Sequence, residues 1–112
     1  MEITTRRIGK CKVLDCIGSL TQGHDALALR NAIREAVKDG TSKVVLNLRN
    51  VRSIDSGGLG EMIGGYVHVK NQGGKLVFLN PSKKIQRMIA HMKLLCILEL
   101  IDDEQKALEG CE

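Results

Sequence analysis

Residues 53–60 read SIDSGGLG and connect two segments of different character. The segment before them, residues 43–48, is almost wholly apolar, as in a strand that is buried on both faces of a sheet. The segment after them repeats apolar residues at helical spacing as far as residue 69. The stretch therefore predicts a strand followed by a helix, with an acid, a hydroxyl and two glycines at the junction.

The junction offers two residues that could cap the predicted helix. The first turn of a helix leaves backbone N–H groups without partners and carries the positive end of the helix dipole. Asp55 and Ser56 are both suitable N-cap residues. Ser56 can equally carry a phosphate, because helix starts stabilise anions. From local chemistry alone, Ser56 is either a cap or a site of modification.

Glycines are unusually frequent in the same predicted helix, at Gly57, Gly58, Gly60, Gly64 and Gly65. Each interior glycine costs about 0.5–1 kcal/mol relative to alanine, a large concession against a usual total stability of about 5–15 kcal/mol. Gly57, Gly60 and Gly64 share one helical face, which suits the close approach of another surface. That surface is either the protein's own sheet or a second protein.

The remaining segments alternate between strands and helices. We expect a hairpin at residues 2–8 and 11–18, a helix at 25–39, strands at 75–79 and 96–101, and a short helix after 102. A third helix after Ser82 should have the inner face Ile85, Met88, Ile89 and Met92. The order β-β-α-β-α-β-α-β-α predicts an α/β fold, with a mixed, mostly parallel central sheet flanked by helices. Residues 1–112 are expected to form a single domain.

Composition and charge argue against nucleic-acid binding and mildly favour acidic partners. The chain has one Phe, one Tyr and no Trp, which argues against aromatic stacking on single-stranded nucleic acid. The net charge of +4 mildly favours acidic partners. Without a dense basic run, however, we expect no direct nucleic-acid binding. Lys83, Lys84 and Arg87 form either a solvated face or a docking patch for an acidic partner.

The N-terminal residues contain no apolar signal region, and no segment reaches the length of a membrane span. We therefore expect a cytoplasmic protein without membrane insertion. The cysteines contain no CxxC pair and have no histidine at zinc-finger spacing; they are Cys11, Cys16, Cys96 and Cys111. They are expected to be reduced, partly as small core residues, and to bind no metal.

Enzyme motifs are missing or incomplete. The dinucleotide-binding fingerprint fails at Ile63, where its third glycine would fall, and there is no P-loop and no G-x-S-x-G motif. No spacing ties His24, His68 or His91 to Ser56 as a base. The sequence thus predicts no catalytic residues, no cofactor and no enzymatic activity, and a small nucleotide-binding enzyme remains only as an alternative.

The chain resembles the STAS domain family over essentially its whole length, and most closely the bacterial anti-sigma factor antagonists. The resemblance rests on the order of elements and on residues 54–60, which are similar to the family's DSxGLG signature. The turn at residues 73–76 and the ending at residues 102–108 are also similar. Two positions depart from the family: Gly57, where Ser, Thr or Ala is frequent, and residues 18–21, which read GSLT instead of GELD.

The resemblance implies that Ser56 is phosphorylated by an anti-sigma factor that is itself a serine kinase. Unmodified protein would bind the anti-sigma factor and release a sigma factor, phosphorylation would abolish binding, and a PP2C-type phosphatase would reset the switch. The implied partner-binding residues are Thr21, Asp55, Ser56, Gly57, Gly58, Leu59, Gly60 and Gly64. The alternative is a soluble STAS subunit of a lipid-transport ABC system or a signalling scaffold, which binds an ATPase or another STAS protein without phosphorylation.

Overall fold

Five strands form one sheet in the computed structural model of the chain, which describes residues 1–93 and 97–111. In spatial order they are β1 (Glu2–Ile8), β2 (Cys11–Leu20), β3 (Lys43–Ile54), β4 (Lys75–Leu79) and β5 (Glu99–Ile101). β1 pairs antiparallel with β2, and every other neighbouring pair is parallel. The mixed, mostly parallel sheet predicted from the sequence is confirmed.

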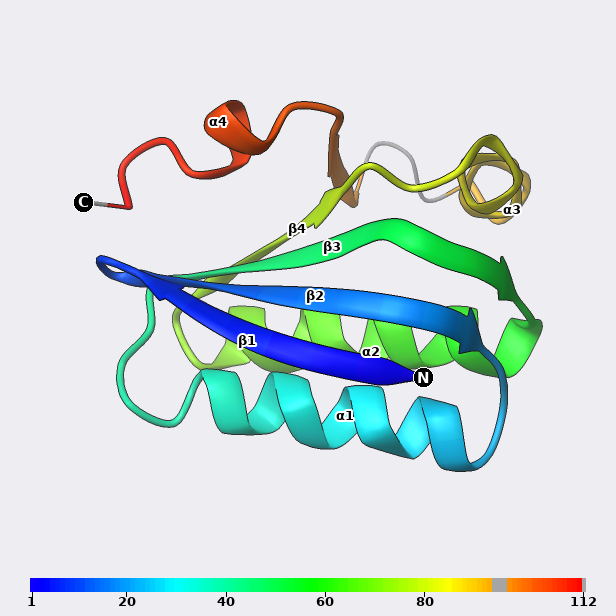
Figure 1. The fold of residues 1–112 in the computed structure, drawn as a ribbon, viewed down its shortest axis with the longest axis horizontal. Helices are drawn as coiled ribbons and strands as arrows, with labels where there is room; N and C mark the ends of the chain where they lie inside the picture. The colour runs from blue at the N-terminus through cyan, green and yellow to red at the C-terminus, as the bar shows by residue number, and fades with distance from the viewer. Residues whose placement is uncertain (94–96, 112) are drawn as a thin grey trace.

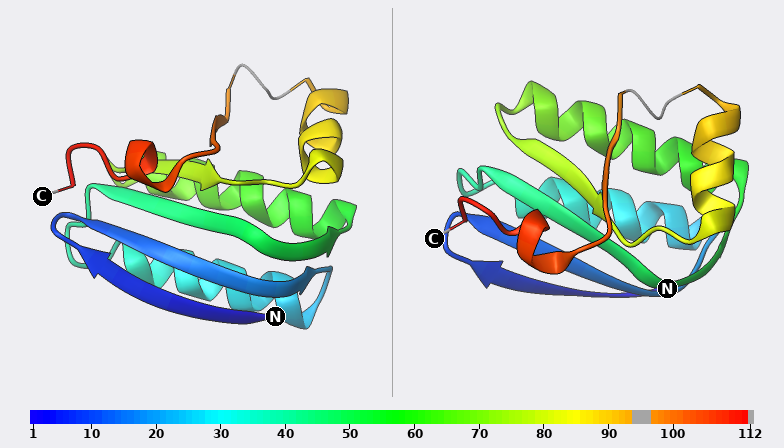
Figure 2. Two further views of the ribbon diagram at one scale, coloured as in Figure 1. Left: turned by 45° about the horizontal axis from the view of Figure 1, so that its top comes forward. Right: turned by 90° about the horizontal axis from the view of Figure 1, so that it is seen from above.

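Helices cover both faces of the sheet (Figure 1). They are α1 (His24–Ala36), α2 (Ser56–Asn71), α3 (Lys83–His91) and α4 (Glu104–Ala107). α1 and α2 lie side by side across one face, and α4 lies on the other face. α3 stands beyond the end of β3, next to the start of α2, as both views in Figure 2 show. None of the helices described is long and apolar enough to cross a membrane.

The strand register gives each face of the sheet its own core, because successive side chains of a strand point to opposite faces. One row of paired residues packs with Ala107 of α4: Val13, Val45 and Val77. The adjacent row belongs to the core that includes residues of α1, α2 and α3: Leu14, Leu46 and Phe78. All six are 0% exposed. The nearly unbroken apolar run in β3 therefore follows from burial on both faces.

Several elements differ from the sequence-based expectation in their extent. β2 continues to Leu20 instead of ending at residue 18, and α1 ends at Ala36 instead of residue 39. β3 continues to Ile54 instead of ending at Leu48, and its last part pairs with β2 through irregular register. Only every third residue there, Val51 and Ile54, is buried, so the segment carries no strand-like pattern. β5 begins at Glu99, and the residue predicted to start it, residue 96, lies outside the described residues.

The predicted inner face of α3 is wrong at Met92, whereas Met88 packs against the core although it is only partly buried. Ile85 and Ile89 are fully buried, but Met88 is only half-buried and Met92 is 53% exposed. Met92 is the C-cap residue of α3, and its N–H still donates to the Met88 carbonyl at 3.2 Å. Its side chain lines an open groove between α3 and α2 instead of packing into the core. Ser82 caps the helix as expected, since its hydroxyl accepts a hydrogen bond from the N–H of Ile85 at 3.2 Å.

The cysteines also require a correction. Cys11 and Cys111 form a disulfide, with their Cα atoms 5.3 Å apart, although both were expected to be reduced. The C-terminal segment returns to the β1–β2 turn, where the Lys10 N–H donates to the Cys111 carbonyl at 2.7 Å. A separation of 100 residues gives no local signal in the sequence. Cys16 is a free, buried thiol as expected, and burial raises its pKa to about 12; Cys96 lies outside the described residues.

Candidate functional site

Asp55 organises the junction between β3 and α2. Its Oδ1 accepts a hydrogen bond from the N–H of Gly58 at 2.8 Å, which makes Asp55 the N-cap of α2. Its Oδ2 accepts from the N–H of Gln22, in the loop before α1, at 3.0 Å. The Asp55 N–H itself donates to the carbonyl of Leu20 at 3.2 Å. One aspartate therefore ties together the loops that follow β2 and β3.

These hydrogen bonds also fix the charge of the junction. The N–H groups of Gln22 and Gly58 hold the pKa of the Asp55 carboxyl below its usual value, because they stabilise the carboxylate. The positive end of the α2 dipole favours the same ionised form. The anion at the start of α2 is thus Asp55, whose two oxygens are both engaged within the protein.

Ser56, the first residue of α2, has the opposite character. It is exposed, and within residues 1–93 and 97–111 its hydroxyl makes no hydrogen bond. Ser53, the nearby competing hydroxyl, is half-buried and donates to the Ser19 hydroxyl at 2.9 Å. Asp55 is therefore the cap of α2, and the Ser56 hydroxyl is left exposed and without a hydrogen bond among the described residues.

The glycines of α2 divide into two sets. A Cβ atom on Gly58 would lie 2.3 Å from the Leu20 carbonyl oxygen, and one on Gly57 would lie 2.7 Å from Cβ of Gln22. These two glycines let the start of α2 approach the protein's own backbone. Gly60 and Gly64, in contrast, have nothing within 4 Å of such an atom. Close approach of the protein's own chain therefore explains Gly57 and Gly58. Gly60 and Gly64 leave open space beside the helix backbone.

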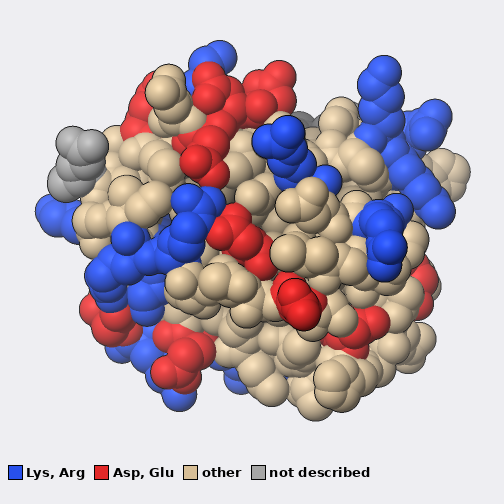
Figure 3. Space-filling view, in the orientation of Figure 1, with Lys and Arg blue, Asp and Glu red and all other residues tan. Residues whose placement is uncertain are grey.

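An apolar groove runs between α2 and α3 and includes Ser56; we name it the α2–α3 groove. Its volume is about 430 Å³, and its lining residues are Ser56, Leu59, Lys84, Arg87, Met88, His91 and Met92. Leu59 is almost fully buried beneath it, whereas Met92 is open to solvent. Figure 3 shows basic side chains gathered over α3. The sequence had assigned the two methionines to the core, so it missed this surface.

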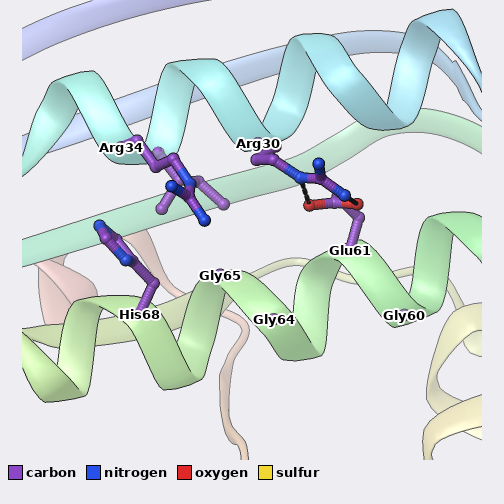
Figure 4. Close-up of a pocket in the computed structure, with 8 residues that line it drawn as sticks. Arg30, Arg34, Gly60, Glu61, Gly64, Gly65 and His68 are labelled. Carbon is purple, nitrogen blue, oxygen red and sulfur yellow. Dashed lines mark hydrogen bonds and ion pairs between the residues drawn. The ribbon is translucent and has the colours of Figure 1, made fainter.

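A second groove lies on the other flank of α2, against α1, and is polar (Figure 4). Arg30 of α1 binds Glu61 of α2 through two hydrogen bonds, Nε to Oε1 at 2.7 Å and Nη2 to Oε2 at 3.0 Å. Beyond this pair, Arg34 and His68 point toward one another across a cavity of about 240 Å³. We name this feature the α1–α2 groove; Gly60 and Gly64 line it as well.

The predicted partner-binding residues are only partly gathered into one surface. Thr21, directly after β2, is half-buried and donates to Asp25 Oδ2 at 3.0 Å. It shares the junction with Asp55, Ser56 and Gly57. Gly58 and Leu59 are buried and follow Ser56 in the first turn of α2. Gly60 and Gly64 line the α1–α2 groove instead. The part of the chain that the structure describes contains no cluster of three or more potential metal ligands.

Comparison with known proteins agrees with this architecture. The family model described as the STAS domain matches residues 2–107. The Anti-sigma F factor antagonist of Paenibacillus polymyxa is 28% identical over 90 residues, covering 80% of this chain and 77% of that protein. A candidate anti-sigma factor antagonist of Thermotoga neapolitana is 31% identical over 75 residues, covering 67% of this chain and 66% of that protein.

Solved structures show the same fold. The crystal structure of a candidate anti-sigma factor antagonist from Thermotoga maritima has a TM-score of 0.87 at 22% identity, covering 97% of this chain and 93% of that one. The Bacillus cell fate determinant SpoIIAA in its phosphorylated form has a TM-score of 0.77 at 19% identity, covering 99% and 100%. Because the family model matches nearly the whole length of the chain, residues 2–107, the chain belongs to the STAS domain family.

Proposed function

We propose that the protein is an anti-sigma factor antagonist that acts as a partner switch, with Ser56 as its phosphorylation site. One observation carries the proposal: the Ser56 hydroxyl is exposed and unbonded among the described residues, beside an apolar groove, while Asp55 has taken the role of cap. The similarity to proteins named as anti-sigma factor antagonists supports the choice of partner.

In the unmodified state, the α2–α3 groove accepts an apolar side chain of the anti-sigma factor over Leu59, Met88 and Met92. Lys84 and Arg87 at the same groove attract acidic residues of that partner. Formation of this complex releases the sigma factor that the anti-sigma factor had held. The protein needs no catalytic group of its own for this role, so in this proposal it is not an enzyme.

The anti-sigma factor, acting as a serine kinase, transfers the γ-phosphoryl group of ATP to Ser56. A bond forms between Oγ and phosphorus, the bond to the ADP oxygen breaks, and the hydroxyl proton passes to a base of the kinase. The phosphate adds a charge of about −1.5 to −2 at neutral pH. A charge left unpaired in an interface costs several kcal/mol, and about 4 kcal/mol corresponds to a thousandfold loss of affinity. A PP2C-type phosphatase restores the hydroxyl by hydrolysis.

The proposal places the protein in the cytoplasm, where sigma factors act. A disulfide is uncommon in that compartment. Both sulfur-bearing residues are nevertheless buried, with Cys11 1% and Cys111 0% exposed. Thiol–disulfide exchange requires access to a sulfur atom, so burial slows reduction of this bond.

The test compares two substitutions of one residue. Ser56→Ala should bind the cognate anti-sigma factor as tightly as the wild type in calorimetry, and Ser56→Asp should bind at least about a hundredfold more weakly. Asn71→Asp adds the same charge to the exposed far end of α2 and should leave affinity unchanged. Equal affinity of the two Ser56 variants would refute the proposal, and co-purification with an ATPase and a permease would favour the ABC-transport alternative.

A further inference from the structure

A phosphate on Ser56 would find the nearest backbone donors already in use. The Gly58 N–H donates to Oδ1 of Asp55, and the Gln22 N–H donates to Oδ2. The phosphate would also lie one residue from the Asp55 carboxylate, which is ionised and repels it. The start of α2 therefore supplies little compensation for a second anion, and the opposing charge has to come from another element.

Two cations of α3 are available for that purpose. Lys84 and Arg87 line the same groove as Ser56. Both are exposed, and neither belongs to an ion pair in the described part of the chain. Arg30, on the opposite flank of α2, differs in that its guanidinium is already bound to Glu61. The α3 side of the groove thus carries positive charge that is unpaired among the described residues, in the groove that Ser56 also lines.

We propose that a phosphate on Ser56 is bound in cis by Lys84 and Arg87. A guanidinium presents its N–H donors in a fork that matches two phosphate oxygens, and a lysine ammonium can bind a third. The inference rests on the proposed function for the choice of Ser56 as the modified residue. It adds that α3 binds the phosphate directly, besides attracting an acidic partner.

Binding in cis changes what the modification does. The phosphate carries about −1.5 to −2 charges, which offsets the two positive charges of Lys84 and Arg87. An acidic partner segment then loses its attraction to the α2–α3 groove, and the phosphate covers part of the apolar surface over Leu59. With the phosphate charge paired inside the protein, the modification weakens binding by removing these favourable contacts, without any rearrangement of the fold.

The test places phosphoserine at position 56 during translation by stop-codon suppression, so that no kinase is needed. Phosphorus NMR then follows the second ionisation of the phosphate as a function of pH. The charged or titratable groups near it are Asp55, Lys84, Arg87 and His91. In the otherwise wild-type protein the phosphate pKa should lie about one unit lower than in the double variant Lys84→Gln/Arg87→Gln.

Lys83→Gln is the matched control, since Lys83 is an exposed cation of the same helix that does not line the groove. It should leave the phosphate pKa unchanged. A second measurement needs no substitution: about 1 M NaCl should remove much of the shift by screening. Identical phosphate pKa values in the wild type and the double variant would overturn the inference, whatever the response to salt.

The outcomes separate the inference from the proposed function. If the pKa shift is present but the phosphorylated protein still binds the anti-sigma factor, the partner switch fails and binding in cis stands. If phosphorylation abolishes the complex but the pKa shift is absent, the partner switch stands and binding in cis fails. Circular dichroism of each variant verifies that the exposed substitutions preserve the fold.

Discussion

The two flanks of α2 differ sharply although one helix provides both. Toward α1, the helix is joined to its own chain by the two-point Arg30–Glu61 contact, and a Cβ on Gly65 would lie 2.5 Å from Cδ1 of Ile33. Toward α3, the surface is apolar, holds Ser56 and Met92, and carries unpaired cations among the described residues. The first flank packs against α1 within the fold, whereas the second forms an open apolar groove with α3.

The difference shows how one helix can separate the residues that stabilise the fold from the residues that are exposed for recognition. Residues that hold the junction together, such as Asp55 and Gly58, make internal contacts and are poorly placed to meet a partner. Residues that can meet a partner, such as Ser56 and Met92, contribute little to the core. Substitutions on the two sides should consequently change two different measured quantities.

The largest expected effect concerns the fold as a whole and neither flank in particular. Removing the Cys11–Cys111 disulfide by Cys111→Ser should lower the unfolding free energy by about 3–5 kcal/mol, because the bond closes a loop of some 100 residues. Urea unfolding measures the loss. Affinity for the anti-sigma factor, measured where the variant is still folded, should not change, and a parallel loss of affinity would mean that stability and recognition are coupled.

The next effect compares two alanine substitutions within α2. Gly58→Ala should destabilise the protein by about 3 kcal/mol or more, since its Cβ would collide with the Leu20 carbonyl oxygen. Gly64→Ala meets open space and should stabilise the helix by about 0.5–1 kcal/mol. Both values come from urea titration of the purified variants. Similar changes at the two positions would contradict the division of the glycines into packed and open sets.

A smaller effect distinguishes the flanks by affinity. Met92→Gln should weaken anti-sigma factor binding about tenfold, or about 1.4 kcal/mol, by removing apolar contact in the α2–α3 groove. Its effect on unfolding should stay within about 0.5 kcal/mol, because the side chain is exposed. Glu61→Gln should behave in the opposite way, costing stability by up to about 1 kcal/mol and leaving affinity unchanged. The reverse pattern would place the partner on the α1 side.

The smallest effect is a pH dependence at the junction. The folded-state pKa of Asp55 is lowered, so its carboxylate stabilises the fold above the ordinary value near 4. That contribution is lost as pH falls through the folded-state pKa. The stability difference between wild type and Asp55→Asn should therefore be largest near neutral pH and shrink below about pH 4. A difference that is constant with pH would show that the carboxylate charge is not what caps α2.

The sequence predicted most of the fold because its signals are local. The alternation of β1 and β2, the apolar runs of β3 and β4, and the Ser82 cap all depend on neighbours in the chain. The end of β3 was missed because exposed Arg49, Asn50 and Arg52 interrupt its pattern. The Cys11–Cys111 disulfide was missed because it joins residues that only the folded chain brings together.

The junction was predicted less completely for a related reason. Asp55 and Ser56 are equivalent caps by local chemistry. The folded chain adds a contact to Asp55 alone, from the N–H of Gln22, which is 33 residues away. The use of each glycine likewise depends on which surface packs against it. The α2–α3 groove was not predicted, because spacing alone cannot distinguish a methionine that packs into the core from one that lines an open groove between two helices.

The state of one hydroxyl tests the proposed switch better than any other quantity. We would isolate the protein from its native cells while the kinase is active and locate phosphate by peptide mass spectrometry. The expected result is a single phosphate on Ser56 that disappears in a Ser56→Ala strain, with Ser53 unmodified. Phosphate on Ser53 or elsewhere in its place, or none at all under kinase-active conditions, would contradict the assignment of Ser56 as the switch.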